Sequence, residues 1–125
     1  MKTAIPVMYR DGDNYKIHGC LVADGAITDS DREKLRASLH SGDLYLPLQL
    51  GLDYYGTDWS SYDPDDCDHP WHEMSVDDIE VAEENNLRLP GQHVEHVGPI
   101  DTFVRKVAAA SSVGWDSKRY CPDAS

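Results

Sequence analysis

The middle of this sequence lacks basic residues. No Lys or Arg occurs between Arg36 and Arg88, and this 51-residue stretch (37–87) contains thirteen Asp and Glu. The remaining residues include ten acids and eleven bases, so the net charge of -12 belongs to the middle. Such a field repels nucleic acids and acidic membranes, and it attracts cations or a basic protein surface. Direct binding of nucleic acid or of a membrane is therefore not expected.

Cysteines and long apolar runs are also scarce. Cys20, Cys67 and Cys121 form an odd, scattered set, unlike the even sets of disulfide-stapled secreted domains. The N-terminal apolar run is broken by Pro6 and closed by Arg10, which is too short for a secretory signal. No run approaches the roughly 18 apolar residues of a membrane span. We expect a cytoplasmic protein with reduced thiols.

Familiar catalytic motifs are missing. The sequence contains no HExxH, no CxxC, no phosphate-binding Walker loop, no GxGxxG and no GxSxG. His18 and Cys20 share one face of an expected strand, but a Cys among apolar strand residues is more often core filler than a nucleophile. Charge runs are usually solvated, and one such run supplies the carboxylates of Glu73, Asp77, Asp78 and Glu80. We expect no enzymatic activity, and a small enzyme of unknown class is the second alternative.

The composition present is that of a folded domain. The chain has 125 residues, 40% hydrophobic and 27% charged, which predicts a single domain over 1–125. Apolar residues alternate over 3–9 and 15–22 around a turn at 10–14 that contains Asp-Gly, a pattern that predicts a β-hairpin.

The next segments predict alternating helices and strands. A short helix is expected over 29–41, where Ser30, Thr28 or Asp29 can supply the N-cap. Alternating leucines predict a strand over 44–50, which Pro47 assigns to a sheet edge or bulge. A long, exposed acidic loop follows at about 53–69.

The last third predicts one interrupted strand and one helix. Strand character returns over 71–81, with Asp77 and Asp78 as a bulge or bend, whereas 87–97 is ambiguous. Pro99 opens an amphipathic helix that ends near Gly114. The order is β-β-α-β-β-α. It predicts the α+β class, with a mainly antiparallel sheet and helices packed on one face.

Three short motifs carry a resemblance to known proteins. They are the run Tyr9-Arg10-Asp11-Gly12-Asp13-Asn14-Tyr15-Lys16, the run Trp71-His72-Glu73, and the ending Phe103-Val104 with Gly114-Trp115-Asp116. Together they resemble a family of small uncharacterised bacterial proteins with a YRDxxNYK-type N-terminal hairpin and a WHE-type strand. The motifs cover about a fifth of the chain directly. The resemblance implies a bacterial source and a compact α+β domain, and it implies no activity.

One segment gathers residue types that bind metals. Cys67, His69 and His72 lie close together, and His93-x-x-His96 offers further imidazoles. Zn²⁺ accepts thiolate and imidazole ligands together in four-coordinate sites. The spacing matches no accepted zinc motif, and the alternative is that His72 lies on a strand while His69 belongs to the loop. A zinc-binding domain is the first alternative function.

Aromatic residues stand among the acids of the long loop. Tyrosine and tryptophan dominate interaction hot spots, and surrounding acids steer a basic partner towards them. The alternative is that some of these rings fold back onto the sheet. The expected partner-binding residues are Tyr54, Tyr55, Trp59, Tyr62, Asp63, Asp65 and Asp66. The leading hypothesis is a non-enzymatic protein of the immunity, inhibitor or nucleic-acid-mimic type that binds a basic protein surface.

Overall fold

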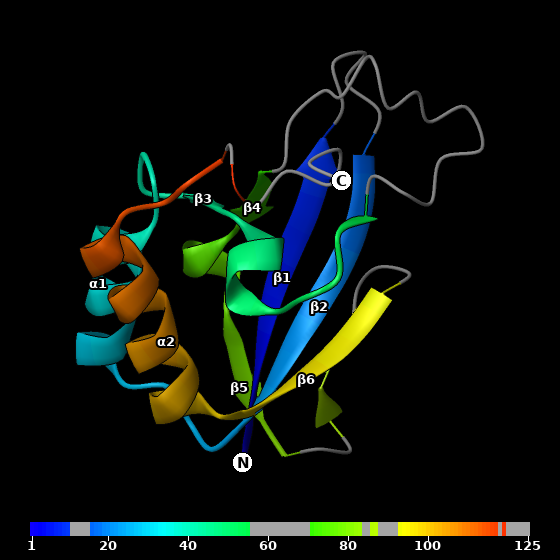
Figure 1. The fold of residues 1–125 in the computed structure, drawn as a ribbon. Coiled ribbons are helices and arrows are strands. Elements are labelled where there is room, and N and C mark those ends of the chain that lie inside the picture. The colour runs from blue at the N-terminus through cyan, green and yellow to red at the C-terminus, as the bar shows by residue number, and fades with distance from the viewer. Residues whose placement is uncertain (11–15, 56–70, 84–85, 88–92, 118, 120–125) are drawn as a thin grey trace.

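Two alternating strands form the centre of the sheet. The computed structural model describes residues 1–10, 16–55, 71–83, 86–87, 93–117 and 119 (Figure 1). Strand β1 (Lys2–Arg10) pairs antiparallel with β2 (Lys16–Asp24) along their whole length. Residues Ile5 and Leu21 face the main core and are fully buried. The predicted hairpin and its buried face are confirmed, although the turn residues 11–15 lie outside the described residues.

Helix α1 (Asp29–Ser38) begins where the sequence predicts and ends earlier. The Thr28 hydroxyl accepts a hydrogen bond from the Asp31 amide at 3.1 Å, so Thr28 is the N-cap among the three candidates. Leu35 is its fully buried residue, and Leu39 follows as the C-cap. The helix therefore spans 29–38 and not 29–41.

The strand expected over 44–50 is wrong for most of its length. Only Leu44–Tyr45 form a strand, β3, and Pro47–Leu50 form a 3₁₀ helix, η1. Proline has no amide hydrogen to donate and its φ suits the first position of a helical turn. Gly51 ends η1 with φ 74°, a left-handed conformation. The alternating leucines therefore lie on β3 and on a short helical turn in which Leu46 and Leu50 are buried. Strand β3 does lie at a sheet edge, as Pro47 predicts.

The segment 71–81, which the sequence predicts to be one interrupted strand, contains three short elements. Strand β4 (His72–Met74) pairs with β1 and β3, and strand β5 (Glu80–Ala82) pairs with the other end of β1. Between them, η4 (Val76–Asp78) is a single 3₁₀ turn. The interruption expected at Asp77 and Asp78 is confirmed and takes the form of this turn.

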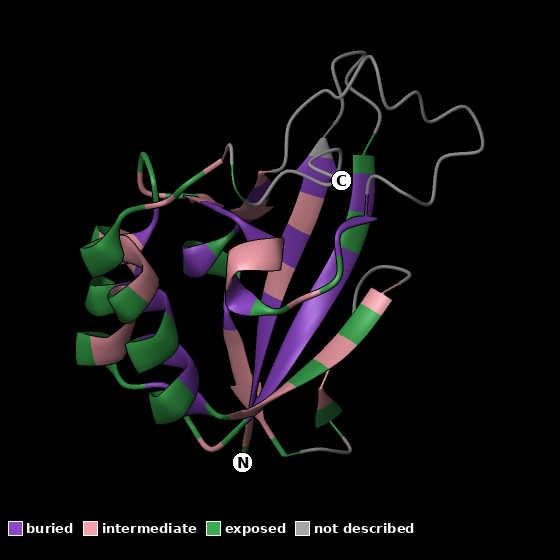
Figure 2. Cartoon of the chain, in the orientation of Figure 1, coloured by how far each residue is buried: buried purple, intermediate pink, exposed green. Residues whose placement is uncertain are grey.

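The sheet is mixed and not purely antiparallel. Strand β6 (His93–Pro99), in the segment that the sequence left ambiguous, pairs parallel with β2. The strand order is β3-β4-β1-β2-β6, with β5 beside β1. Because β6 is an edge strand with alternating partial burial, it lacks the apolar alternation that identifies β1 and β2 (Figure 2).

Helix α2 (Ile100–Val113) confirms the clearest prediction for the C-terminal part. Its core-facing residues Ile100, Phe103, Val104 and Val107 are buried, and Gly114 ends it with φ 108°. Helices α1 and α2 lie side by side against the same face of the sheet (Figure 1). The opposite face has a smaller buried cluster of Ala4, Cys20 and Val22 under Leu87. Among the described elements, no helix has both the length and the apolar character to cross a membrane.

Candidate functional site

A hollow with an acidic rim lies at the sheet edge formed by β3 and β4. Its volume is about 270 Å³, and Met8, Met74 and Val76 give it an apolar wall. We call it the acidic hollow. The carboxylates that line it belong to Asp43, Glu73, Asp77 and Asp78. Sequence reasoning grouped the last three as a charge run, but no sequence signal places Asp43 with them.

Arg36 is the basic side chain among the residues lining the acidic hollow, and acids of this chain already contact it. Its guanidinium contacts Glu33 at 2.6 Å and forms an ion pair with Asp77. Asp43 and Asp78 form no ion pair with any described residue. The acidic hollow therefore retains negative charge after Arg36 is counted.

Backbone hydrogen bonds fix the main chain that carries the acids of the hollow. The Met74 amide donates to the Asp43 carbonyl at 2.7 Å, and the Ser75 amide donates to the Pro6 carbonyl at 3.0 Å. The Asp78 amide donates to the Ser75 carbonyl at 3.1 Å and closes the η4 turn. The backbone at these positions is therefore ordered before any ligand binds.

Helix α1 fixes η4 from the other side. The Arg32 guanidinium donates to the carbonyls of Val76 at 3.3 Å and Ile79 at 3.2 Å. These carbonyls belong to the first residue of η4 and to the residue directly after it, and the Val76 carbonyl also accepts the Ile79 amide at 3.3 Å. The turn that carries Asp77 and Asp78 is thus attached to both β1 and α1.

A second group of chemically active side chains is buried beside the sheet. The His72 ring is 1% exposed and contacts the rings of Tyr9, Tyr45, Tyr54 and Tyr55, with centroids 4.5–5.7 Å away. Its Nε2 accepts a hydrogen bond from the Tyr55 amide at 3.2 Å. That bond requires the neutral ring to have its proton on Nδ1. A substrate in solution cannot reach His72, because the four tyrosines enclose it.

The same cluster extends to β6. The His93 ring stacks on Tyr55 at 4.3 Å, and the Glu95 carboxylate accepts the Asp53 amide at 3.1 Å. Burial raises the pKa of Glu95, and the Asp53 charge adds to this, while the hydrogen bond from the Asp53 amide opposes it. Burial, with the neighbouring Tyr55 and Glu95, raises the pKa of the Tyr45 phenol well above its usual value. The Tyr45 phenol therefore stays neutral.

Two expected partner-binding residues lie in the core. Tyr54 is 6% exposed and Tyr55 is 1% exposed, so the interface prediction for them is corrected: their rings fold back onto the sheet. Tyr54 packs edge-on to Tyr9 at 5.3 Å. The other five predicted residues lie outside the described residues: Trp59, Tyr62, Asp63, Asp65 and Asp66.

The predicted metal ligands are only partly described, since Cys67 and His69 lie outside the described residues. His93 faces Tyr55 and the aromatic cluster, whereas His96 pairs in register with Val22 on the opposite face of the sheet. Residues three apart on a strand point to opposite faces. The Tyr55 ring stacks on the His93 ring and contacts the His72 ring at a tilt of 37°.

No group of three or more metal-ligating side chains occurs within the described ranges. The zinc site stays a prediction, because it also depends on Cys67 and His69. Elemental analysis of protein purified without a His-tag checks it: stoichiometric zinc, with stabilisation on adding the metal, is the expected result, and absence of both contradicts it.

Cys20 is not suited to nucleophilic chemistry. Its side chain is fully buried in the smaller cluster, and burial raises the pKa of its thiol. A raised thiol pKa reduces the thiolate, which is the reactive form. His18 is exposed beside it on the strand. The structure therefore favours the core-filler interpretation of Cys20.

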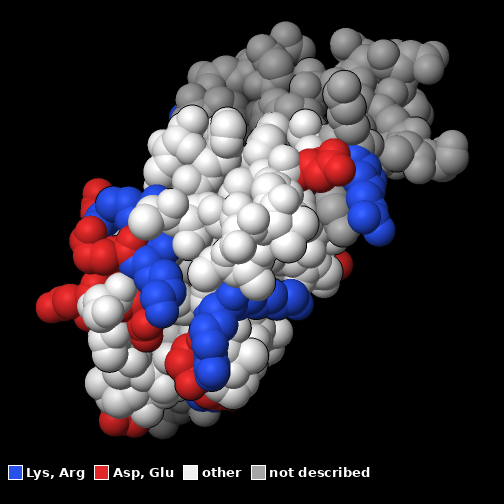
Figure 3. All heavy atoms as spheres, turned by 60° about the vertical axis from the view of Figure 1, so that its left-hand side comes forward, with Lys and Arg blue, Asp and Glu red and all other residues white. Residues whose placement is uncertain are grey.

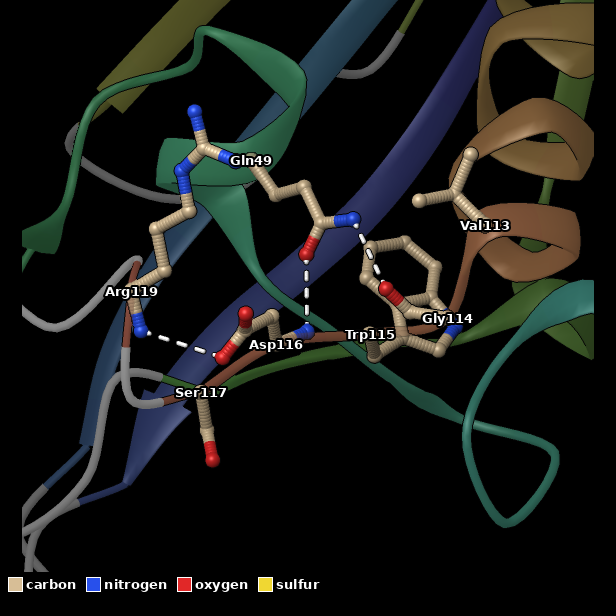
Figure 4. Close-up of a pocket in the computed structure, with 7 residues that line it drawn as sticks. All are labelled: Gln49, Val113, Gly114, Trp115, Asp116, Ser117 and Arg119. Carbon is tan, nitrogen blue, oxygen red and sulfur yellow. Dashed lines mark hydrogen bonds between the residues drawn. The ribbon is translucent and has the colours of Figure 1, made fainter.

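A second, larger hollow lies where η1 contacts the segment that follows α2. Its volume is about 430 Å³ (Figure 4). The Gln49 side chain donates to the Gly114 carbonyl at 3.2 Å and accepts the Asp116 amide at 3.0 Å. The Trp115 indole donates to the Ser38 carbonyl at 3.0 Å, the last residue of α1. Both ends of the Gln49 amide are therefore used within the protein.

Comparison of the chain with family models, with curated proteins and with solved structures gave no match. The resemblance noted from its sequence motifs therefore stays a prediction, and the functional argument depends on the geometry of the chain itself.

Proposed function

We propose that this chain is a non-enzymatic interaction protein whose acidic middle, residues 37–87, binds a basic protein surface. The acidic hollow is the observation that carries the proposal: four carboxylates line it, and its one lining base, Arg36, already contacts Glu33 and Asp77. A partner that supplies positive charge balances the rest. Immunity proteins, inhibitors and nucleic-acid mimics belong to this functional class.

The distribution of charge outside the middle supports the same proposal. On the face turned forward in Figure 3, basic and acidic side chains adjoin one another. Arg105 pairs with Asp101 at 3.1 Å on α2, and Lys2 pairs with Asp24. Charges paired in this way attract a distant ion weakly. The acidic middle therefore supplies most of the long-range field that steers an incoming partner.

The chemistry of the buried groups supports a binding role over an enzymatic one. Among the described residues, the fully buried His and Cys are His72 and Cys20, and neither lines one of the two hollows described above. General acid–base catalysis requires a group within hydrogen-bond reach of substrate. Asp43, Asp77 and Asp78 in the acidic hollow are exposed, and attraction of cations is the property that the acids of the hollow share.

The experiment compares two variants of equal charge. The first, Asp63→Asn/Asp65→Asn/Asp66→Asn, removes three charges from the acidic middle. The matched control, Ser30→Lys/Ala109→Lys/Ser112→Lys, adds three charges at exposed helical positions. Immobilised protein is exposed to a cell extract of its source at low and high salt, and retained proteins are identified and purified for titration. We expect a basic partner that salt releases, that the first variant binds at least about tenfold more weakly, and that the control retains. Equal weakening by both variants, or a partner insensitive to salt, contradicts the proposal.

A further inference from the structure

We propose that the outer edge of strand β6 pairs antiparallel with the same strand of a second copy of this chain. This inference goes beyond the proposed function, because the acidic hollow lies at the β3 end of the sheet and β6 lies at the other end (Figure 1). Strand β6 pairs with β2 on one side, and no described segment pairs with its other side. An edge strand presents a row of amides and carbonyls that fits another extended strand.

The sequence of β6 has few of the features that protect an edge from such pairing. Protected edges usually carry lysine, proline or a bulge. Strand β6 has seven residues and contains neither Lys nor Arg, and its proline, Pro99, stands at the last position. The irregularity in its pairing with β2 comes late, between Val22 and Ala23. Residues 93–96 therefore form a regular edge.

Val94 places an apolar side chain at this edge. It is 42% exposed, and it is one of three large hydrophobic residues that are exposed in the described part of the chain. In the register of β2 and β6 it lies beside Cys20, which is fully buried with Ala4 and Val22 in the smaller cluster. Val94 therefore extends the apolar surface of this cluster to the rim of the sheet, and a strand beyond β6 would cover it.

The residues around Val94 are complementary to themselves in an antiparallel register. If Val94 faces Val94 of the second copy, His93 of each copy faces Glu95 of the other. Opposite residues of an antiparallel pair have Cβ atoms about 4.5–5.5 Å apart, so an imidazole N–H can donate to the carboxylate. Within its own chain, Glu95 accepts the Asp53 amide through Oε2, which leaves Oε1 for this contact.

Neighbouring registers lack this complementarity. A register centred on Glu95 places two carboxylates opposite each other, and like charges directly opposite are destabilising. A register centred on His96 places two imidazoles opposite each other and faces Glu95 with Val97. The sequence of β6 therefore favours the register centred on Val94.

The charge distribution favours β6 over the acidic middle as the surface between two copies. The net charge of -12 opposes association of two copies, but it belongs to residues 37–87, and β6 contains one acid, Glu95. Pairing through β6 leaves the two acidic hollows at the far ends of the joined sheets. Added salt screens the repulsion between the copies, so it should strengthen the dimer, whereas it weakens the attraction of a basic partner.

Sedimentation equilibrium of the full chain at low and high salt tests the dimer. We expect a monomer–dimer equilibrium that salt shifts towards the dimer. The variant Val94→Lys places like charges against each other at the centre of the pairing and should weaken the dimer at least about tenfold. The matched control Val113→Lys makes the same substitution at an exposed residue of α2 and should keep the dimer. A monomer at every concentration, or equal weakening by both variants, overturns the proposal.

Cysteine substitution in a Cys67→Ser/Cys121→Ser background tests the register. Residues opposite each other in an antiparallel pair have the Cα separation that a disulfide requires. Under mild oxidation Val94→Cys should therefore form a disulfide-linked dimer, and Glu95→Cys, His96→Cys and the control Val113→Cys should not. Cross-linking at 95 or 96 in place of 94 contradicts the register, and cross-linking at none of the three overturns the pairing of β6. Far-ultraviolet circular dichroism establishes first that each variant is folded.

Discussion

Replacing Gly19 by alanine tests the packing that buries Tyr55. A Cβ atom at position 19 would lie 2.2 Å from the Tyr55 hydroxyl oxygen and 2.7 Å from its Cζ. Non-bonded carbon atoms do not approach other heavy atoms this closely, so either the Tyr55 ring or strand β2 must shift. The Tyr55 ring has little room to move, because it contacts the His72 ring on one side and stacks on His93.

The magnitude follows from two opposing effects. Overpacking a well-packed core destabilises by about 1–3 kcal/mol. Replacing glycine by alanine at a position without steric conflict stabilises by about 0.4–1 kcal/mol, because the unfolded chain has less freedom to lose. Gly19 lies within β2 outside the left-handed region, so its backbone accepts alanine. We therefore expect Gly19→Ala to lower the free energy of unfolding by about 1–2 kcal/mol, which is a fall in Tm of roughly 4–8 °C for a domain of this size.

The assay is urea and thermal unfolding followed by circular dichroism, with Tyr55→Phe as the second arm of a double-mutant cycle. Removing the hydroxyl eliminates the 2.2 Å contact and leaves the 2.7 Å contact, so the penalty of Gly19→Ala should become smaller in the Tyr55→Phe background. A rise in Tm for Gly19→Ala, or additive effects of the two substitutions on the free energy of unfolding, would refute the reasoning. Either result would mean that the Tyr55 ring does not pack against position 19.

Two further predictions concern titratable groups. Burial raises the pKa of Glu95, so its carboxylate is more stable as the neutral acid in the folded state than in the unfolded chain. Its contribution to the free energy of unfolding is present at low pH and is lost as the pH rises through the raised pKa. The variant Glu95→Gln keeps an oxygen acceptor for the Asp53 amide, so it should stabilise the protein at neutral pH and lose that advantage in acid. Equal effects on stability at both pH values contradict this. The second prediction uses a Cys67→Ser/Cys121→Ser background, in which Cys20 is the remaining thiol. Cys20 should not react with a thiol reagent at pH about 8 until urea unfolds the protein, because burial opposes thiolate formation. Rapid reaction of the folded protein contradicts this.

The elements with strong periodicity were predictable from the sequence. Strands β1 and β2 and helix α2 each bury one face completely, so their apolar residues recur at the period of the element. The N-cap region of α1 and the glycine after α2 are local chemical signals that do not depend on the rest of the fold, although the sequence offered Ser30 and Asp29 beside Thr28 as the cap. Strands β1 and β2 and helix α2 supply half of the buried residues of the main core.

The elements that were missed depend on tertiary contacts. Leu46 and Leu50 are both buried although η1 is a helical turn, since η1 lies against the core; alternation alone cannot distinguish this from a strand. Strand β6 lies parallel to β2, a pairing between residues that are far apart in the chain. The acidic hollow was missed for the same reason, because Asp43 reaches Glu73 through the short pairing of β3 with β4.

The burial of Tyr54 and Tyr55 changes the interface hypothesis and does not remove it. The Tyr55 amide donates to His72, so two residues 17 positions apart are joined by one hydrogen bond. The acidic segment 56–71 therefore starts and ends at neighbouring positions of the fold. Folding has thus already met the entropic cost of bringing the two ends of this segment together. Glu73, which lines the acidic hollow, directly follows His72. If the proposed partner binds both the hollow and the segment 56–70, neutralising charges in both should weaken one and the same complex.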